Sequence, residues 1–246
     1  IFFASEKTNT IKMFQMFPHS TGFELKNPRS RLSGDTPQIR ESEHYFLRLS
    51  ALEADLLNWV ENQPHWRVNV RNFTRGYIKE GLHDRAITRD IDWGVSVPLD
   101  DYSSKRMYVW FEAVIGYLSA SKEWAILQGK PNAWKDFWYG PNAKTYHFIG
   151  KDNIPFHTII WPAILMGYDK NLNLPFDVPA NEYLNMYGGK FSKSEKRAVW
   201  VKDFLERYDP DILRYYISAS MPETSDTDFT WAEFVRRTND ELVATY

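Results

Sequence analysis

The chain has 246 residues, 43% of them hydrophobic, and a formal net charge of −2 at pH 7. This length supports one large hydrophobic core or two smaller ones. The nearly neutral balance excludes a global attraction to nucleic acid, so any RNA contact must come from local patches. Cysteine is absent, which excludes disulfides and cysteine-ligated metal sites within these residues.

No apolar run approaches the roughly 20 residues that a membrane-spanning helix needs, and no signal-peptide pattern is present. We therefore expect a cytoplasmic protein that makes no membrane contact.

The predicted elements begin after residues 1–25, which show no clear period. A turn-rich stretch at 27–37 leads into a strand that includes Tyr45 and Phe46. Apolar periodicity and helix-start signals predict helices at residues 49–60, 68–81, 112–128, 153–166, 201–208, 210–220 and 231–246. Short apolar runs predict strands at residues 106–111, 144–149 and 183–187. We expect Pro162 to kink its helix and Pro210 to occupy a first helical position. The alternation of strands and helices predicts an α/β fold.

A glycine-led cationic loop is the most informative segment. Gly188 and Gly189 precede Lys190-Phe191-Ser192-Lys193-Ser194, and Glu195-Lys196-Arg197 follows. Glycine lets the backbone approach a ligand closely, a lysine such as Lys193 supplies a compact charge suited to a polyphosphate, and the serines can hydrogen-bond phosphate oxygens. A solvated basic loop is the alternative interpretation of these residues.

A second candidate segment is Val109-Trp110-Phe111-Glu112-Ala113-Val114-Ile115-Gly116-Tyr117-Leu118. We expect Trp110 to end a strand, and Ala113 and Tyr117 to lie one turn apart on the helix that follows. An aromatic wall, a small residue and a phenol would form a slot for a slender, flexible side chain. Ordinary core packing is the alternative.

A third candidate segment is His147-Phe148-Ile149-Gly150-Lys151-Asp152-Asn153-Ile154-Pro155-Phe156-His157. A strand, a glycine and a helix N-terminus commonly place a nucleotide. Gly150 would permit close approach, and Asp152 can accept hydrogen bonds from ribose hydroxyls. His157 lies one turn into the helix, where a histidine satisfied within the core is the alternative. We expect all three segments to converge, because ligands of open α/β sheets bind at the carboxyl ends of the strands.

The cationic loop resembles the KMSKS signature of class I aminoacyl-tRNA synthetases, and the other two segments resemble motifs of the methionyl-tRNA synthetase family. The resemblance covers roughly residues 27–246. It implies an α/β fold with the second half of a Rossmann-type parallel sheet, a connective insertion and a following helical stem-contact region. The implied boundaries are 1–98 for the distal insertion, 99–187 for the second half of the Rossmann domain, and 188–246 for the signature loop and the stem-contact helices.

The resemblance also implies the site residues. Lys193 and Lys190 would be catalytic, with Lys193 stabilising charge that develops on the triphosphate. The resemblance implies ATP binding by Gly150, Asp152, Lys190, Ser192 and Lys193, and methionine binding by Trp110, Ala113, Tyr117 and His157. The implied activity is ATP-dependent ligation of methionine to tRNA(Met), with Mg²⁺ accompanying ATP. No metal ligands are expected in this chain, although zinc occurs elsewhere in relatives that carry a cysteine knuckle.

The family's second signature, H-[IV]-G-H, does not occur in this sequence. We therefore expect the chain to be a piece of a longer synthetase that is inactive and prone to aggregation when expressed alone. Two other interpretations stay open. The first is a leucine- or valine-type synthetase, against which Trp110, Ala113 and Tyr117 argue. The second is a non-catalytic RNA-binding or interaction fragment, since fold does not imply function.

Overall fold

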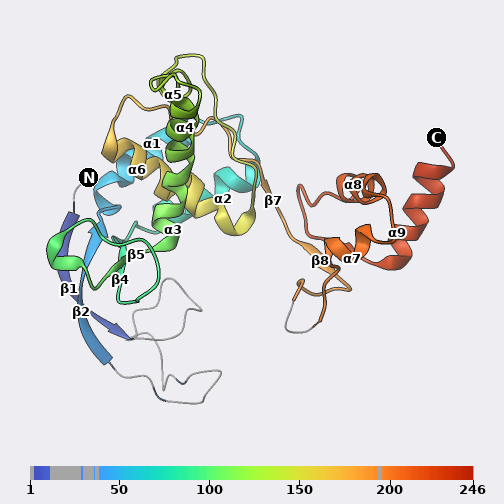
Figure 1. The fold of residues 1–246 in the computed structure, drawn as a ribbon, viewed down its shortest axis with the longest axis horizontal. Coiled ribbons are helices and arrows are strands. Elements are labelled where there is room, and N and C mark those ends of the chain that lie inside the picture. Colours follow the sequence, from blue (N-terminus) through green and yellow to red (C-terminus); the bar gives the residue numbers. More distant parts are fainter. Residues whose placement is uncertain (1–2, 12–28, 30–35, 37–38, 193–195, 246) are drawn as a thin grey trace. The chain divides into compact units, whose positions relative to one another are not determined.

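The computed structural model describes residues 3–11, 29, 36, 39–192 and 196–245 (Figure 1). The chain divides into two compact units, and each unit is built from three segments. Unit 1 comprises Ile1–Trp59, Tyr77–Ala143 and Ile160–Asn173. Unit 2 comprises Val60–Gly76, Lys144–Ile159 and Leu174–Tyr246. Both units therefore depend on residues that lie far apart in the sequence.

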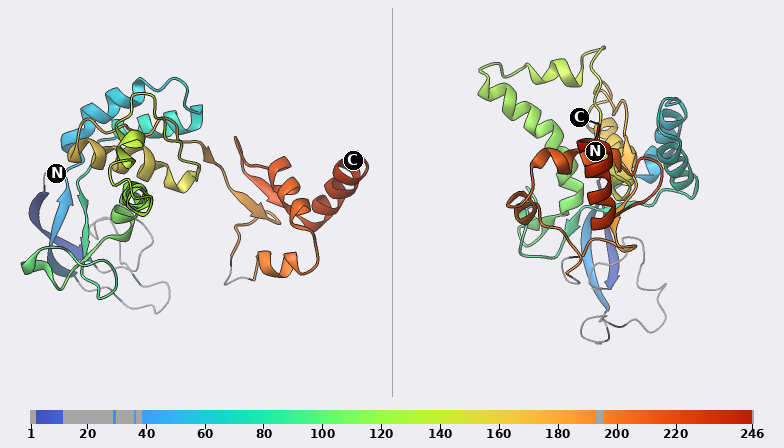
Figure 2. Two further views of the ribbon diagram at one scale, coloured as in Figure 1. Left: turned by 45° about the horizontal axis from the view of Figure 1, so that its top comes forward. Right: turned by 90° about the vertical axis from the view of Figure 1, so that its right-hand side faces the viewer.

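The described strands of unit 1 are antiparallel. Strand β1 (Phe3–Ile11) pairs along its whole length with β2 (Ile39–Leu47), and β3 (Arg85–Ala86) pairs with the end of β2, in the order β1-β2-β3. Strands β1 and β2 lie side by side in each view of Figures 1 and 2. A second antiparallel pair joins β4 (Thr88–Arg89) to β5 (Arg106–Met107).

The helical elements up to residue 173 include short 3₁₀ turns and one π-helical segment. In chain order they are η2 (Ser50–Leu52), α1 (Glu53–Glu61), α2 (Val68–Lys79), η3 (Asp100–Tyr102), α3 (Val109–Glu112), η4 (Ala113–Ile115), α4 (Gly116–Leu127), α5 (Trp134–Trp138), η5 (Lys151–Asn153), the π-helix η6 (Phe156–Ile160) and α6 (Trp161–Tyr168). Elements α3, η4 and α4 follow one another without a break, so residues 109–127 form one continuous helical stretch.

Aromatic packing organises the core of unit 1 around Trp161, which is only 1% exposed. The ring of Trp138 meets it edge-on with centroids 5.7 Å apart, and the ring of Tyr117 lies 6.2 Å away. Such pairs add about 0.5–1.5 kcal/mol to the free energy gained by burial. Helices α4, α5 and α6 each contribute one of these three rings, which ties the helical stretch that carries Tyr117 to the core of unit 1.

Unit 2 contains two parallel strand pairs. Strand β6 (Ile149–Gly150) pairs with β7 (Ala180–Asn181), and β8 (Leu184–Met186) pairs with β9 (Thr227–Phe229). The helical elements after residue 173 are α7 (Val201–Leu205), α8 (Pro210–Ala219), α9 (Trp231–Arg237) and the π-helix η7 (Thr238–Val243). A buried cluster lies among these elements, formed by Met186, Phe204, Tyr216, Phe229 and Phe234, with Leu184, Val199, Ile212, Leu213 and Trp231 packed against it.

Local sequence signals explain where the helices of unit 2 begin. The Asp209 carboxylate accepts a hydrogen bond from the Asp211 amide at 2.8 Å, and Pro210 occupies the first turn, where its missing N–H costs nothing. The Thr230 hydroxyl accepts from the Glu233 amide at 3.2 Å and caps α9.

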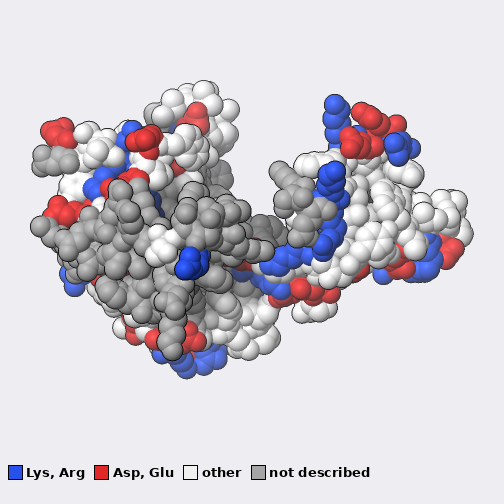
Figure 3. Space-filling model, turned by 90° about the horizontal axis from the view of Figure 1, so that it is seen from below, with Lys and Arg blue, Asp and Glu red and all other residues white. Residues whose placement is uncertain are grey.

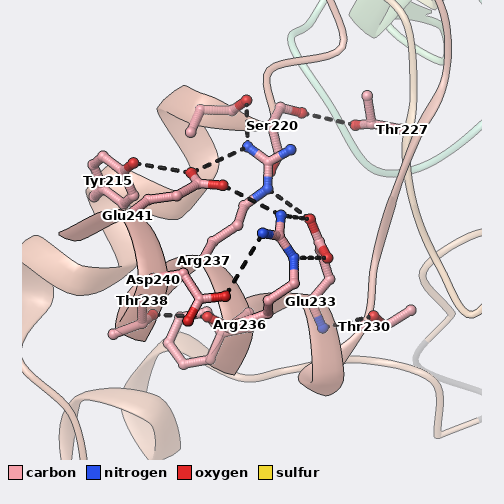
Figure 4. A network of polar contacts seen from close by, with 12 residues as sticks. Tyr215, Ser220, Thr227, Thr230, Glu233, Arg236, Arg237, Thr238, Asp240 and Glu241 are labelled. Atoms are coloured by element: carbon pink, nitrogen blue, oxygen red, sulfur yellow. Dashed lines mark hydrogen bonds and ion pairs between the residues drawn. The ribbon is translucent and has the colours of Figure 1, made fainter. Parts of the chain in front are cut away.

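A polar network fixes the end of α9 (Figure 4). Glu233 accepts hydrogen bonds from Arg236 and Arg237 at 2.8 Å each, and Glu241 accepts one from the Tyr215 hydroxyl at 3.0 Å. These arginine contacts lower the pKa of Glu233 to about 2. The negative charges therefore neutralise both arginines locally, which leaves little positive field at this point of the surface.

Charge is unevenly placed on the visible face in Figure 3. Acidic and basic side chains are mixed over much of it, including the part near the C-terminal helix, whereas a band of Lys and Arg lies over the part that carries β8 and α7. Because the net charge of the chain is close to zero, attraction of an anionic ligand depends on a local basic patch of this kind.

Three sequence predictions need correction. Residues 108–111 are not a strand, because α3 begins at Val109, so Trp110 lies in a helix. The helical stretch predicted at 153–166 is not a regular α-helix: the π-helix η6 runs directly into α6, which holds Pro162 in its first turn. The predicted helix at 231–246 is α-helical only in Trp231–Arg237, and η7 follows it.

Within the described part of the chain, no helix combines the length and apolar character required to cross a bilayer.

Candidate functional site

A tight hairpin positions the start of the signature loop. The amide of Met186 donates to the Gly189 carbonyl at 2.8 Å, and the Gly189 amide donates back at 3.2 Å. The two central residues both have positive φ, 50° at Tyr187 and 72° at Gly188. Such a turn needs this conformation at both positions, which explains the glycine at 188 and places some strain on Tyr187.

The signature loop itself is closed at its base. Ser192 and Arg197 form an antiparallel bridge whose two backbone hydrogen bonds measure 2.8 and 2.9 Å. Lys190 is exposed, and its ammonium lies 4.8 Å from the centroid of the Tyr183 ring. The predicted catalytic residue Lys193 lies outside the described residues, so its role stays a prediction. The structure describes the two other predicted phosphate-binding residues of the loop, Lys190 and Ser192.

The third candidate segment, residues 147–157, is called the nucleotide segment below. It has the predicted order of strand, glycine and helix, although its first helical turn is a 3₁₀ turn. Strand β6 ends at Gly150, η5 begins at Lys151, and the Ile149 amide donates to the Pro179 carbonyl at 3.1 Å. Gly150 is exposed, and a Cβ placed on it would meet nothing within 4 Å. Its backbone is therefore open to close approach by a ligand. The exposed carboxylate of Asp152 accepts a hydrogen bond from the Tyr183 hydroxyl.

His157 lies on a π-helical turn, a feature that is frequent at functional sites. Its side chain is 5% exposed, and Nδ1 donates to the Asn153 carbonyl at 2.9 Å. The ring of His147, from the start of the same motif, lies 5.3 Å away between centroids. Residues 147–157 therefore bring two buried imidazoles together.

Burial lowers the pKa of both histidines. The pKa of His147 falls from 6.5 to about 4, mainly through loss of hydration and secondly through His157. Desolvation also lowers the pKa of His157, against the opposing effect of the Asn153 carbonyl. Both rings are therefore neutral at pH 7, a form suited to lining a pocket for an uncharged side chain.

These shifts predict a loss of stability in mild acid. A buried histidine with a depressed folded-state pKa stabilises the fold fully above its unfolded pKa of 6.5, and this contribution disappears as the pH falls towards 4. His147 alone should cost about 1 kcal/mol between pH 7.5 and 5.5. Thermal melting of the full-length protein should show a smaller acid shift for His147→Gln than for wild type. The control His83→Gln changes an exposed histidine and should behave like wild type. Equal acid shifts in all three proteins would contradict the prediction.

The three predicted aromatic-slot residues lie on one helical stretch of unit 1. Trp110 is in α3, Ala113 in η4 and Tyr117 in α4, so they follow one another at intervals of three and four residues. Trp110 is 48% exposed, Tyr117 is 41% exposed, and Ala113 is exposed. Trp110 is thus about half exposed, whereas the ring of Tyr117 also packs against the buried Trp161 in the core of unit 1. His157 belongs to unit 2, and its place beside these residues remains a prediction.

Sequence reasoning missed a cluster beside the nucleotide segment. It consists of Lys151, Glu182, Tyr183 and Asp226, which come from three separate stretches of unit 2. Lys151 lies inside one of the candidate motifs and Tyr183 at the start of a predicted strand, but no pattern in the sequence marks Glu182, Tyr183 or Asp226 as part of a site. Among the described residues, no group of three or more histidines or carboxylates is arranged to hold a metal ion.

Comparison with known proteins gives consistent relatives. A family model described as tRNA synthetases class I (M) matches residues 4–246. A methionine–tRNA ligase of Dehalococcoides mccartyi is 66% identical over 223 residues, covering 91% of this chain and 40% of the relative. The methionine–tRNA ligase of Thermomicrobium roseum is 55% identical over 223 residues, covering 91% of this chain and 38% of the relative.

Solved structures agree. The structure of Mycobacterium tuberculosis methionyl-tRNA synthetase in complex with methionyl-adenylate aligns with a TM-score of 0.74 at 26% identity, over 98% of this chain and 46% of that one. This chain thus spans about 40% of the length of the curated relatives that it matches.

Proposed function

We propose a function from one premise: this chain belongs to the class I tRNA synthetases, in the methionine group of that family. The protein of which it forms part is a methionine–tRNA ligase. It activates methionine with ATP to methionyl-adenylate, releases pyrophosphate and transfers the methionyl group to tRNA(Met). The observation that carries this proposal is the 66% identity to a methionine–tRNA ligase across 91% of the chain.

The activation step needs no protein nucleophile. The methionine carboxylate attacks the α-phosphorus of ATP, and the bond to the pyrophosphate oxygen breaks. The protein's task is to position both substrates and to stabilise the negative charge that develops on the leaving pyrophosphate. Lys193 and Lys190 supply that positive charge, and Ser192 donates a hydrogen bond to phosphate. Gly150 and Asp152 hold the adenosine, a role supported by the open backbone at Gly150 and the exposed carboxylate of Asp152.

Trp110, Ala113, Tyr117 and His157 form the methionine pocket in this proposal. The exposed aromatic faces of Trp110 and Tyr117 and the neutral imidazole of His157 support it, because polarisable sulfur packs well against aromatic rings. The small side chain of Ala113 leaves room between the two rings on the same helical stretch.

Further parts of the proposal concern the surroundings of the site. Mg²⁺ accompanies ATP and is held mainly by its phosphates, as is usual for nucleotide sites. Residues 1–98 are the distal insertion, 99–187 the second half of the Rossmann domain, and 188–246 the signature loop with the stem-contact helices. The band of Lys and Arg in Figure 3 supports a tRNA contact in the last of these regions. We place the protein in the cytoplasm, where tRNA charging serves translation.

Amino-acid-dependent ATP–pyrophosphate exchange by the full-length protein tests the function. Methionine should support exchange, whereas leucine and valine should support it at least about 100-fold less well in kcat/KM, because neither carries a thioether that fits the slot. Exchange supported better by leucine or valine would assign the chain to a different synthetase. Absence of exchange with any amino acid, together with retained RNA binding, would support the non-catalytic alternative.

A further inference from the structure

Tyr183 is in contact with both halves of the proposed ATP site in unit 2. The ammonium of Lys151 lies 4.1 Å from the centroid of its ring. The ammonium of Lys190, the first lysine of the signature loop, lies 4.8 Å from the same centroid. Its hydroxyl donates a hydrogen bond to the carboxylate of Asp152 in the nucleotide segment. One side chain thus joins the signature loop to the nucleotide segment.

The backbone holds Tyr183 firmly in this place. Its amide donates to the Asp226 carboxylate at 2.9 Å, and its carbonyl accepts from the Thr227 amide at 2.9 Å. The preceding residue, Glu182, donates its amide to the Pro222 carbonyl at 2.7 Å. A residue whose backbone is held by hydrogen bonds in this way can orient the side chains around it, because it is already ordered and loses little conformational entropy when a ligand binds.

The two lysines on the ring are not held alike. Lys151 is fixed by Glu182 at 2.7 Å and by Asp226 at 2.8 Å, and these hydrogen bonds raise its pKa, Asp226 having the larger effect. Glu182 accepts a hydrogen bond in turn from the side-chain amide of Asn69 at 3.2 Å. Lys190 is exposed, and its ammonium makes a weak cation–π contact with the Tyr183 ring. A phosphate oxygen would bind its ammonium more strongly than a ring face does.

We propose that Tyr183 is a positioning residue for ATP, whose ring keeps the Lys190 ammonium beside the site and whose hydroxyl fixes the Asp152 carboxylate. This proposal rests on the proposed function of the same site. In the free protein the ring holds Lys190 close to where phosphate arrives. When ATP binds, Lys190 can leave the ring for phosphate with little loss, while Asp152 stays oriented towards the ribose.

Two substitutions separate the two contacts. Tyr183→Phe keeps the ring and removes the hydroxyl, whereas Tyr183→Leu removes both. In the full-length protein, Tyr183→Phe should raise the KM for ATP about fivefold and leave kcat within about twofold. Tyr183→Leu should raise the KM for ATP and also lower kcat about tenfold, because Lys190 is no longer held. The KM for methionine should stay unchanged in both variants.

The matched control is Tyr168→Leu. Tyr168 is an exposed tyrosine of unit 1 with the Lys122 ammonium 5.8 Å from its ring, and it has no place in the proposed site. This variant should leave all three kinetic constants within about twofold of wild type. If Tyr183→Phe lowered kcat as much as Tyr183→Leu does, the ring would have no separate role and the proposal would be overturned.

A double-mutant cycle with Lys190→Met tests the pairing itself. Removing Lys190 should cost clearly less in the Tyr183→Leu protein than in wild type, since the contact is already lost. Equal costs in both backgrounds would show that Tyr183 and Lys190 act independently and would overturn the proposal.

Calorimetric titration of ATP into the same proteins without amino acid separates this proposal from the proposed function. A wild-type protein that binds ATP but shows no methionine-dependent exchange would contradict the function alone. In that case weaker ATP binding by Tyr183→Phe would still support the positioning role, and unchanged binding by both Tyr183 variants would refute it. The titration also covers the case in which Tyr183→Leu fails to fold, because the Phe variant alone then decides.

Discussion

Replacing Lys193 with alanine in the full-length protein will lower the rate of methionine activation by about 10²-fold or more. Loss of one donor that stabilises charge in a transition state typically has this effect. The affinity for methionine should change little, because Lys193 acts on the phosphates. ATP–pyrophosphate exchange measures the rate, and an exchange rate close to that of wild type would remove Lys193 from the mechanism.

A control and a second variant sharpen this experiment. Lys202→Ala removes an exposed positive charge from α7 and should leave exchange within about twofold, which separates a local effect from a general change of charge. Lys193→Arg keeps the charge but replaces a compact ammonium with a planar fork. It should recover only part of the lost rate if the position of the charge matters as well as its presence.

Replacing Ala113 with leucine will raise the KM for methionine by about tenfold or more and will leave the KM for ATP unchanged. The larger side chain fills the slot beside Trp110 and Tyr117, and overpacking of this kind costs about 1–3 kcal/mol. Steady-state exchange kinetics with methionine varied at saturating ATP, and the reverse, give both constants.

The exposure of Ala113 allows an effect on methionine binding to be separated from an effect on folding. Its side chain is exposed within the described structure, so leucine there should not disturb the core of unit 1. The control is Ala120→Leu, an exposed alanine on the same helical stretch in α4, which should leave both constants unchanged. Equal effects of the two substitutions would mean that position 113 does not line the methionine pocket.

The sequence predicted the family and the fold class, and both are confirmed by the family model and by the related solved structures. Helix boundaries were predictable where strong local signals exist. The helix predicted at 68–81 begins with α2 at Val68, although α2 ends at Lys79, and the Asp209-Pro210 start of α8 matches its prediction to the residue. The strand prediction at 106–111 was right only for Arg106–Met107, because a short apolar segment with Val and aromatic residues fits a strand and a helical turn equally well.

The residues of the candidate site also differ in how far the sequence alone could identify them. Gly150, Asp152 and His157 could be named because they stand in one contiguous motif. Tyr183 could not, because its importance comes from partners in two other segments. No periodicity of residues 180–186 indicates that Asp226 will hold the Tyr183 amide or that Asp152 will receive its hydroxyl. Such long-range pairing is set by tertiary structure, which local pattern does not contain.

The chain alternates between the two units on its way from Ile1 to Tyr246, because each unit takes three separate segments. During synthesis on the ribosome, unit 1 stays incomplete until its last segment, Ile160–Asn173, has emerged. By that point two of the three segments of unit 2 are already outside as well. The nascent chain must therefore keep two unfinished cores open at once, with contacts that close only across long stretches of sequence. This interval exposes the chain to chaperones and proteases, and slowing translation once residue 173 has left the ribosome would give unit 1 time to close first.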